Sequence, residues 1–185
     1  MKAKQSVFPR WRGFNLLGMF CSETSEYRDF RSPGYYTEED FKMIRDWGFD
    51  FVRLPLSYRL WSDVNNPYEI EESKIAPLDE AVYFSEKSGL HTNIAMHRLP
   101  GYCVNQDEKI EEKESLWTDK NMLDASAYQW TEIAKRYKSI SSDKLSFNVI
   151  NEPDRNITSA QYKAVSERVI NDVRKISPDR LFILD

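Results

Sequence analysis

The sequence places a carboxylic acid directly after an apolar segment, at Asn151-Glu152-Pro153. The preceding residues 145–150 read Leu-Ser-Phe-Asn-Val-Ile, which is typical of a buried strand. Pro153 has no backbone N–H to donate to a neighbouring strand, so we expect the strand to end there. Because α/β barrels carry their chemistry at the carboxyl ends of their strands, Glu152 is a candidate general acid or base. A polar turn is the simpler interpretation of one such tripeptide, so other residues must decide between the two.

Two further polar residues, Arg53 and His97, each follow a run of apolar, strand-type residues. Each has a structural explanation of its own: Arg53 could extend to solvent, His97 could be a hydrogen-bonded core imidazole and Asn151 could cap a helix. Consecutive parallel strands, however, bring their carboxyl ends to one edge of a sheet. The sequence therefore predicts that Arg53, His97, Asn151 and Glu152 lie in one site.

Several other kinds of chemistry find no support in the sequence. The two histidines, His91 and His97, lie at opposite ends of one predicted strand without a cysteine–histidine cluster, so we expect no metal site and no cofactor. No Gly-x-Ser-x-Gly motif is present for a serine nucleophile. The net charge of −4 and the pI near 5.4 argue against nucleic-acid binding, and no segment is apolar enough to predict a membrane span.

The segments that must position these residues alternate between strand and helix patterns. Strands are predicted at residues 13–17, 49–55, 91–97, 145–150 and 181–185. Helices are predicted from Thr37 to Gly48, around 78–85, at 122–137 and at 162–173. Such alternation implies parallel strands with right-handed crossovers, and we expect an α/β fold, a (β/α)8 TIM barrel with only about the first five strands present in this chain. A doubly wound sheet is disfavoured, because no glycine-rich phosphate-binding turn follows a strand.

The composition fits one globular domain. Hydrophobic residues make up 41% and charged residues 30% of the chain, and aromatic residues reach 14%. Apolar rings with polar edges suit sugar faces, although core packing accounts for most of them. No apolar signal segment follows Met1, so we expect a cytoplasmic protein, or a secreted one whose signal peptide is absent. Cys21 and Cys103 both follow predicted strands, which leaves a disulfide between them open.

Four segments resemble, in their order along the chain, the family 5 glycoside hydrolases, which are cellulase-type retaining enzymes built on a (β/α)8 barrel. The matching segments are Arg12-Gly13-Phe14-Asn15, Phe51-Val52-Arg53-Leu54-Pro55, Met96-His97-Arg98-Leu99-Pro100-Gly101-Tyr102 and Phe147-Asn148-Val149-Ile150-Asn151-Glu152-Pro153. They extend over essentially the whole chain. The ordered set is stronger evidence than the Asn-Glu-Pro tripeptide alone.

The resemblance implies a role for each candidate residue. Glu152 would be the catalytic general acid/base, and Asn151 would hold the sugar 2-hydroxyl. Arg53 would orient a nucleophilic carboxylate and keep it ionised, and His97 would be a hydrogen-bonding partner on the substrate side. Three aromatic residues on the predicted loops are expected to stack on sugar rings: Tyr102, Trp61 and Trp117.

One catalytic group of the family has no counterpart in this sequence. A retaining glycosidase needs a second carboxylate about 5–5.5 Å from the first, and the family supplies it as a glutamate on strand seven. Residues 1–185 are therefore expected to be a partial catalytic barrel, truncated after strand five, with no nucleophile. Asp185 is a weak substitute because it lies on the neighbouring strand. We expect the 185-residue chain to be inactive alone and to self-associate through its open barrel edges.

The resemblance favours an endoglucanase that cleaves internal β-1,4-glycosidic bonds, with a β-linked polysaccharide or oligosaccharide as its partner. Glucan, mannan and xyloglucan are not distinguished. The alternative is a non-catalytic carbohydrate-binding or scaffold half-barrel, since the nucleophile is absent. An isomerase or lyase on the same barrel is a third, weaker interpretation; residues 1–185 show no phosphate-binding turn, although that turn usually follows strands seven and eight.

Overall fold

A parallel sheet forms the centre of the computed structural model, which describes residues 10–16, 36–103, 115–153 and 156–185. Its five parallel strands are β1 (Gly13–Asn15), β2 (Phe51–Ser57), β3 (His91–Leu99), β5 (Leu145–Asn148) and β6 (Leu181–Ile183). They lie side by side in the order of the chain. A short strand, β4 (Tyr102–Cys103), turns back and pairs antiparallel with the end of β3.

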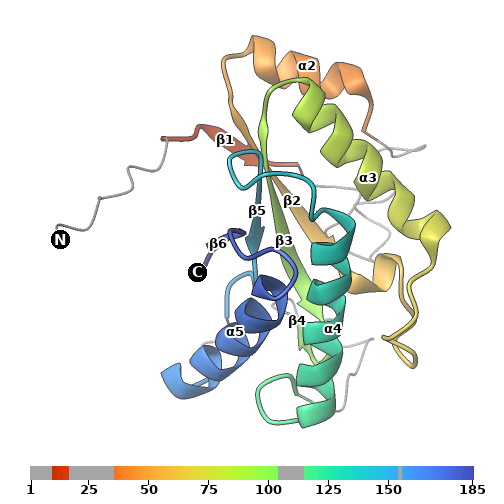
Figure 1. The fold of residues 1–185 in the computed structure, drawn as a ribbon, viewed down its shortest axis with the longest axis vertical. Helices are drawn as coiled ribbons and strands as arrows, with labels where there is room; N and C mark the ends of the chain where they lie inside the picture. Colours follow the sequence, from red (N-terminus) through yellow and green to blue (C-terminus); the bar gives the residue numbers. More distant parts are fainter. Residues whose placement is uncertain (1–9, 17–35, 104–114, 154–155) are drawn as a thin grey trace, which may run out of the picture.

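Helices connect each consecutive pair of parallel strands in the described chain, and α3 and α4 lie beside the sheet on the same side (Figure 1). They are α2 (Glu38–Asp46), α3 (Glu72–Lys87), α4 (Lys120–Arg136) and α5 (Ser159–Arg174), and a 3-10 turn, η2 (Tyr58–Leu60), follows β2. A strand followed by a helix is the repeating unit of a (β/α)8 barrel. The predicted fold, a barrel segment with five parallel strands, is confirmed.

The ends of α2 are set by the residues that the sequence pattern indicated. Thr37 is the N-cap, and its backbone N–H donates to Asp40 Oδ2 at 2.8 Å in a capping box. Gly48 follows the helix with φ +87°, a left-handed conformation that glycine adopts readily. The predicted start and end of this helix are therefore confirmed.

The two faces of the sheet carry different side chains, because successive strand residues point to opposite sides. On the helix side, Leu54, Ile94 and Phe147 are fully buried, and Phe147 packs against Trp130 of α4. The polar strand residues that hydrogen bond with one another on the opposite face are Asn15, Arg53, His91, Asn93, His97, Ser146 and Asn148. The alternation thus gathers the candidate site residues on the inner wall of the barrel.

The end of β5 differs from the prediction. The strand ends at Asn148, two residues before the predicted end, and Val149 and Ile150 lie in a bend. Asn151 then returns toward β3, and its backbone N–H donates to the Met96 carbonyl at 2.9 Å. The strand therefore ends because the chain bends toward β3, before Pro153 is reached.

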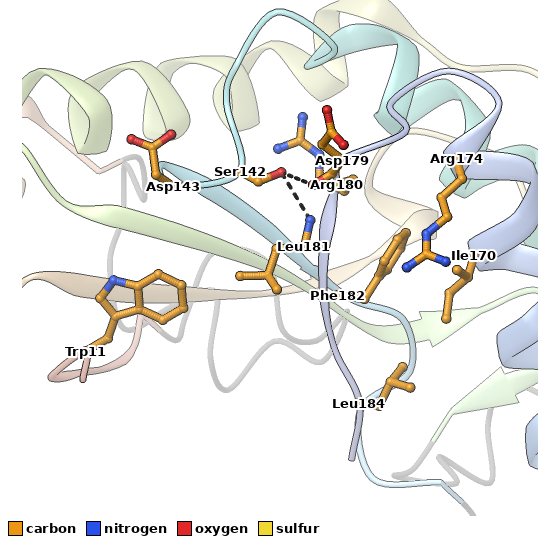
Figure 2. A pocket seen from close by; sticks show the side chains of 10 residues that line it. All are labelled: Trp11, Ser142, Asp143, Ile170, Arg174, Asp179, Arg180, Leu181, Phe182 and Leu184. Carbon is orange, nitrogen blue, oxygen red and sulfur yellow. Dashed lines mark hydrogen bonds between the residues drawn. The ribbon is translucent and has the colours of Figure 1, made fainter. Parts of the chain in front are cut away.

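A groove of about 590 Å³ runs beside β6 (Figure 2). It is lined by Trp11, Ser142, Asp143, Ile170, Arg174, Asp179, Arg180, Leu181, Phe182 and Leu184. In the described part of the chain, β6 pairs only with β5 and β1 pairs only with β2, so each leaves one edge unpaired there. No helix within the described ranges is long and apolar enough to cross a membrane.

Candidate active site

The Arg53 guanidinium is the centre of a hydrogen-bonded cluster at the carboxyl ends of the strands. Its Nη2 donates to Asn148 Oδ1 at 2.5 Å and to Asn151 Oδ1 at 2.7 Å. Its Nη1 donates to Asn15 Oδ1 at 3.3 Å and lies 3.1 Å from His97 Nε2. Residues from β1, β2, β3 and the end of β5 therefore meet at one guanidinium. Three of the predicted site residues, Arg53, His97 and Asn151, are brought together in this way.

The contact with Arg53 fixes the protonation state of His97. A guanidinium can only donate hydrogen bonds, so His97 Nε2 must accept and the proton of the neutral ring lies on Nδ1. Burial and the charge of Arg53 lower the pKa of His97 from 6.5 to about 4, although the charge of Asp185 acts in the opposite direction. The imidazole is therefore neutral near pH 7.

Arg53 is a half-buried cation with neutral hydrogen-bond partners. Burial lowers the pKa of its guanidinium, while the negative charges of Asp185 and Glu152 raise it. Guanidinium groups remain protonated in proteins, so the site keeps a positive charge beside two carboxylates. This charge is suited to holding a carboxylate in its ionised form.

Glu152 follows directly on this cluster and is exposed, whereas Asn151 is 4% exposed. The backbone of Glu152 has φ +49°. Its N–H donates to Asp185 Oδ2 at 2.9 Å, and its carbonyl accepts from the Tyr102 hydroxyl. The carboxyl group is thus presented to solvent at the edge of the sheet, where a substrate could reach it.

Tyr102 supports the backbone of the site. Its hydroxyl donates to the carbonyl oxygens of Asn151, at 2.9 Å, and Glu152. Its ring is 6% exposed and contacts the edge of Trp117, with 5.4 Å between ring centroids. The expected stacking of Tyr102 on a sugar ring is therefore wrong, because the ring is buried.

The two predicted tryptophan contacts have different outcomes. Trp61 is 1% exposed, and its Nε1 donates to Gln129 Oε1 at 2.8 Å in the core. Its expected stacking on sugar is wrong, because no face of this indole reaches the surface. Trp117 is half-buried beside Tyr102, so its contact with substrate stays a prediction.

Asn15 and Asn148 were not assigned a role from the sequence, and Asp185 was considered only as a weak substitute for the nucleophile. Asn15 and Asn148 both accept hydrogen bonds from Arg53, and Asp185 accepts from the backbone of Glu152. Asn148 lies two positions after Ser146, so the period of a strand could have placed both on the polar face. The proximity of Asp185 to Glu152 depends on how β5 and β6 pair, which no local pattern reveals.

Two predictions about other groups remain partly open. Cys103 Sγ accepts from Arg98 Nη2 at 3.1 Å, but Cys21 lies outside the described residues, so a bond between the two cysteines stays untested. Within the described ranges, no group of three histidine, cysteine, aspartate or glutamate residues could hold a metal ion. An exposed carboxyl beside a half-buried arginine, at the carboxyl edge of parallel strands, is the kind of active site that barrel enzymes have.

The chain belongs to the cellulase family, glycosyl hydrolase family 5, which matches residues 3–185. Cellodextrinase A of Ruminococcus flavefaciens is 29% identical over 173 residues, which cover 94% of this chain and 49% of that protein. Endoglucanase C of Acetivibrio thermocellus is 28% identical over 171 residues, which cover 91% of this chain and 47% of that protein. The chain thus spans about half the length of the curated relatives it matches.

Solved structures agree with this assignment. A crystal structure of a glycoside hydrolase matches with a TM-score of 0.83 and 32% identity, and the match covers 94% of this chain and 52% of that one. A hyperthermophilic endo-β-1,4-glucanase in complex with substrate has the same fold, with a TM-score of 0.72 and 24% identity over 95% of this chain and 51% of that one. The resemblance that the sequence indicated is confirmed.

Proposed function

We propose that the protein is a retaining glycoside hydrolase that cleaves internal β-1,4-glycosidic bonds of a glucan-type polysaccharide. The observation that carries the proposal is the exposed carboxyl of Glu152, which lies directly beside the Arg53 cluster. The relatives named as a cellodextrinase and an endoglucanase support cellulose-type glucans and oligosaccharides as the substrate class. The similarity to these relatives supports the class of substrate better than it supports a particular length of the glucan chain.

Glu152 would act twice in such a reaction. It first donates a proton to the glycosidic oxygen as the bond to the leaving sugar breaks, while a second carboxylate attacks the anomeric carbon and forms a glycosyl-enzyme. The deprotonated Glu152 then removes a proton from water, which attacks the same carbon and releases the second sugar. The net configuration at that carbon is retained.

Asn151 and His97 are held so that each has a donor left for the substrate. Arg53 donates to Asn151 Oδ1, which fixes the orientation of the amide and leaves its Nδ2 as a donor to a sugar hydroxyl. Arg53 occupies His97 Nε2 in the same way, so Nδ1–H is the group that can donate. Hydrogen bonds at the sugar 2-hydroxyl strengthen in the transition state of glycoside hydrolysis.

The second carboxylate does not come from the described residues around Arg53. Besides Glu152, Asp185 is an acid whose charge acts on Arg53, but both oxygens of Asp185 face donors at the end of β5. We therefore expect residues 1–185 alone to bind β-glucan weakly or not at all and not to hydrolyse it. The unpaired edges of β1 and β6 would lead this 185-residue chain to self-associate.

Among the described residues near Arg53, no further carboxylate is placed as a nucleophile, which also favours a second candidate, a non-catalytic carbohydrate-binding half-barrel. It differs from the first in what the full-length protein does with a bound glucan. A binding module would retain carboxymethyl cellulose and release no reducing sugar.

A polymer-degrading enzyme would act outside the cell, whereas one restricted to short cellodextrins could act in the cytoplasm.

The stereochemistry of the first product tests the proposal. Proton NMR of cellopentaose hydrolysis by the full-length protein should detect the β-anomer of the new reducing end before mutarotation, together with internal cleavage of carboxymethyl cellulose. Appearance of the α-anomer first would exclude a covalent glycosyl-enzyme. Binding without any cleavage would favour the non-catalytic candidate.

A further inference from the structure

Glu152 has a backbone conformation that needs external support. With φ +49°, it is the non-glycine residue of the described chain that lies in the left-handed region. This conformation costs about 1–2 kcal/mol for a residue with a side chain, so it persists only where the surroundings hold it. The contacts that hold it come from two other elements.

The side chains of Asp185 and Tyr102 hydrogen bond with the peptide groups on both sides of Glu152, and we call these contacts the Glu152 clamp. Asp185, which follows β6, accepts from the Glu152 N–H through Oδ2 at 2.9 Å. Tyr102, on β4, donates its hydroxyl to the Glu152 carbonyl and to the preceding carbonyl of Asn151. Neither contact touches the Glu152 side chain, which remains exposed.

Asp185 also connects the Glu152 clamp to the Arg53 cluster. Its Oδ1 lies 3.4 Å from Asn148 Nδ2, and Asn148 Oδ1 accepts from Arg53 Nη2 at 2.5 Å. The Asn148 amide further donates to the Ile183 carbonyl at 3.0 Å, which ties it to β6 itself. Asp185 thus faces a backbone N–H with one oxygen and a side-chain amide with the other.

We propose that Asp185 and Tyr102 are positioning residues that hold Glu152 in its left-handed conformation and thereby fix where its carboxyl group is presented. The inference rests on the proposed function in so far as Glu152 is the acid/base. A proton donor must be held within about 0.5 Å of its productive place, and an exposed side chain gains that precision only through its backbone. A strained acid residue clamped on both peptide groups meets this requirement.

Amide hydrogen exchange tests the Glu152 clamp without an assay of enzymatic activity. In Asp185→Ala, exchange of the Glu152 N–H should become about tenfold faster or more, since its acceptor is lost. Asp185→Asn keeps an acceptor oxygen and should stay close to the wild type. Asp179→Ala is the matched control, because Asp179 is exposed and precedes β6 at its opposite end. Unchanged exchange in Asp185→Ala would overturn the proposal.

The dependence of the hydrolysis rate on the leaving group, measured in the full-length protein, tests what the Glu152 clamp does for catalysis. Asp185→Ala and Tyr102→Phe should lower kcat/KM for alkyl cellobiosides about tenfold or more and barely change kcat/KM for dinitrophenyl cellobioside, because formation of the glycosyl-enzyme from that substrate needs little protonation. Tyr102→Phe keeps the ring contact with Trp117, and Asp185→Asn should recover most of the lost activity. An equal loss on both substrates would contradict a positioning role.

The two readouts separate failure of the clamp from failure of the proposed function. If the wild-type protein hydrolyses no β-glycoside while Glu152 exchange responds to Asp185→Ala, the clamp stands and the acid/base assignment falls. If the wild type is active but neither readout responds, the clamp falls alone. Should Asp185→Ala unfold, the exchange and kinetics of Asp185→Asn and Tyr102→Phe decide the matter.

Discussion

At the scale of single residues, Arg53 is the group on which the site depends. One planar fork donates to side chains from β1 and β5 and faces the imidazole of β3. No other side chain could serve four acceptors in these directions while carrying a charge. The geometry therefore makes Arg53 both a structural tie between strands and an electrostatic element of the site.

Replacement of Arg53 by lysine separates charge from shape. Arg53→Lys keeps the cation but can reach only part of the acceptors, so we expect a loss of about 1–3 kcal/mol in the free energy of unfolding. Turnover of the full-length protein should fall about a hundredfold, because misplaced groups lose far more in rate than in stability. Urea unfolding and cellopentaose kinetics measure the two effects. Full activity in the folded fraction would make Arg53 purely structural.

The lowered pKa of His97 predicts that the free energy of unfolding depends on pH. Its pKa is about 4 in the folded protein against an ordinary value of 6.5, so the unfolded chain binds a proton first as the pH falls. Stability from this group is complete above pH 6.5 and is lost progressively between pH 6.5 and about 4. Melting temperatures across this range should fall less steeply in His97→Gln, whose amide oxygen can still accept from Arg53. Burial also lowers the pKa of His91, so part of the slope should remain.

Equal slopes in the wild type and His97→Gln would contradict this origin of the pH dependence. Such a result would mean that the imidazole is protonated as readily in the folded protein as in the unfolded chain. The contact between His97 Nε2 and Arg53 would then not exist as an accepting one.

At the scale of elements, the sequence was sufficient for the strands and helices and insufficient for their details. The periodicity of apolar residues and the caps at Thr37 and Gly48 define the α/β order, because these signals are local. The sequence also selected Arg53, His97 and Asn151, since strand ends are readable. It misplaced Trp61, because an aromatic residue on a predicted loop gives no sign that the loop folds over it.

Two glycines with positive φ, Gly101 in the turn between β3 and β4 and Gly89 after α3, should differ in how much stability is lost when alanine replaces them. Gly101 has φ +74°, and a Cβ there would lie 2.6 Å from the Leu116 backbone nitrogen. Gly89 has φ +72° with nothing within 4 Å of such a Cβ. Gly89→Ala should therefore cost about 1 kcal/mol, and Gly101→Ala about 3 kcal/mol or more, because overlap adds to backbone strain.

The same pair of variants should differ in activity. Gly101 precedes Tyr102, so Gly101→Ala should also displace the hydroxyl that supports Glu152 and lower kcat in the full-length protein. Gly89→Ala, at the far end of α3, should leave kcat unchanged. Equal costs and equal activities for the two variants would show that the turn does not position Tyr102.

At the scale of the whole molecule, the sheet edge at β6 matters most. The groove beside it is lined in part by apolar side chains of β6 and α5, together with charged ones such as Arg174 and Arg180, and Leu184 at its end is 48% exposed. An exposed strand edge next to an apolar groove promotes association between chains. The sequence indicated this edge through the number of strands it predicts, whereas the groove required the packing of α5 against β6.

Sedimentation of the 185-residue chain tests the association. Its mass should exceed 21.9 kDa increasingly with concentration, and Leu184→Glu should lower the apparent mass by placing a charge at the edge. Val64→Glu is the matched control, because Val64 is an apolar residue of 42% exposure in the loop after η2. A monomer at all concentrations, or an equal effect of both variants, would contradict association through β6.

The role of Glu152 as general acid/base is tested most directly by Glu152→Gln in the full-length protein. The variant should hydrolyse carboxymethyl cellulose about a thousandfold more slowly and lose much less in glycosyl-enzyme formation from dinitrophenyl cellobioside, which needs no proton. Azide should then restore turnover and yield a β-glycosyl azide, because this anion attacks the glycosyl-enzyme without a base. Near-normal hydrolysis of the polymer by Glu152→Gln would contradict the assignment.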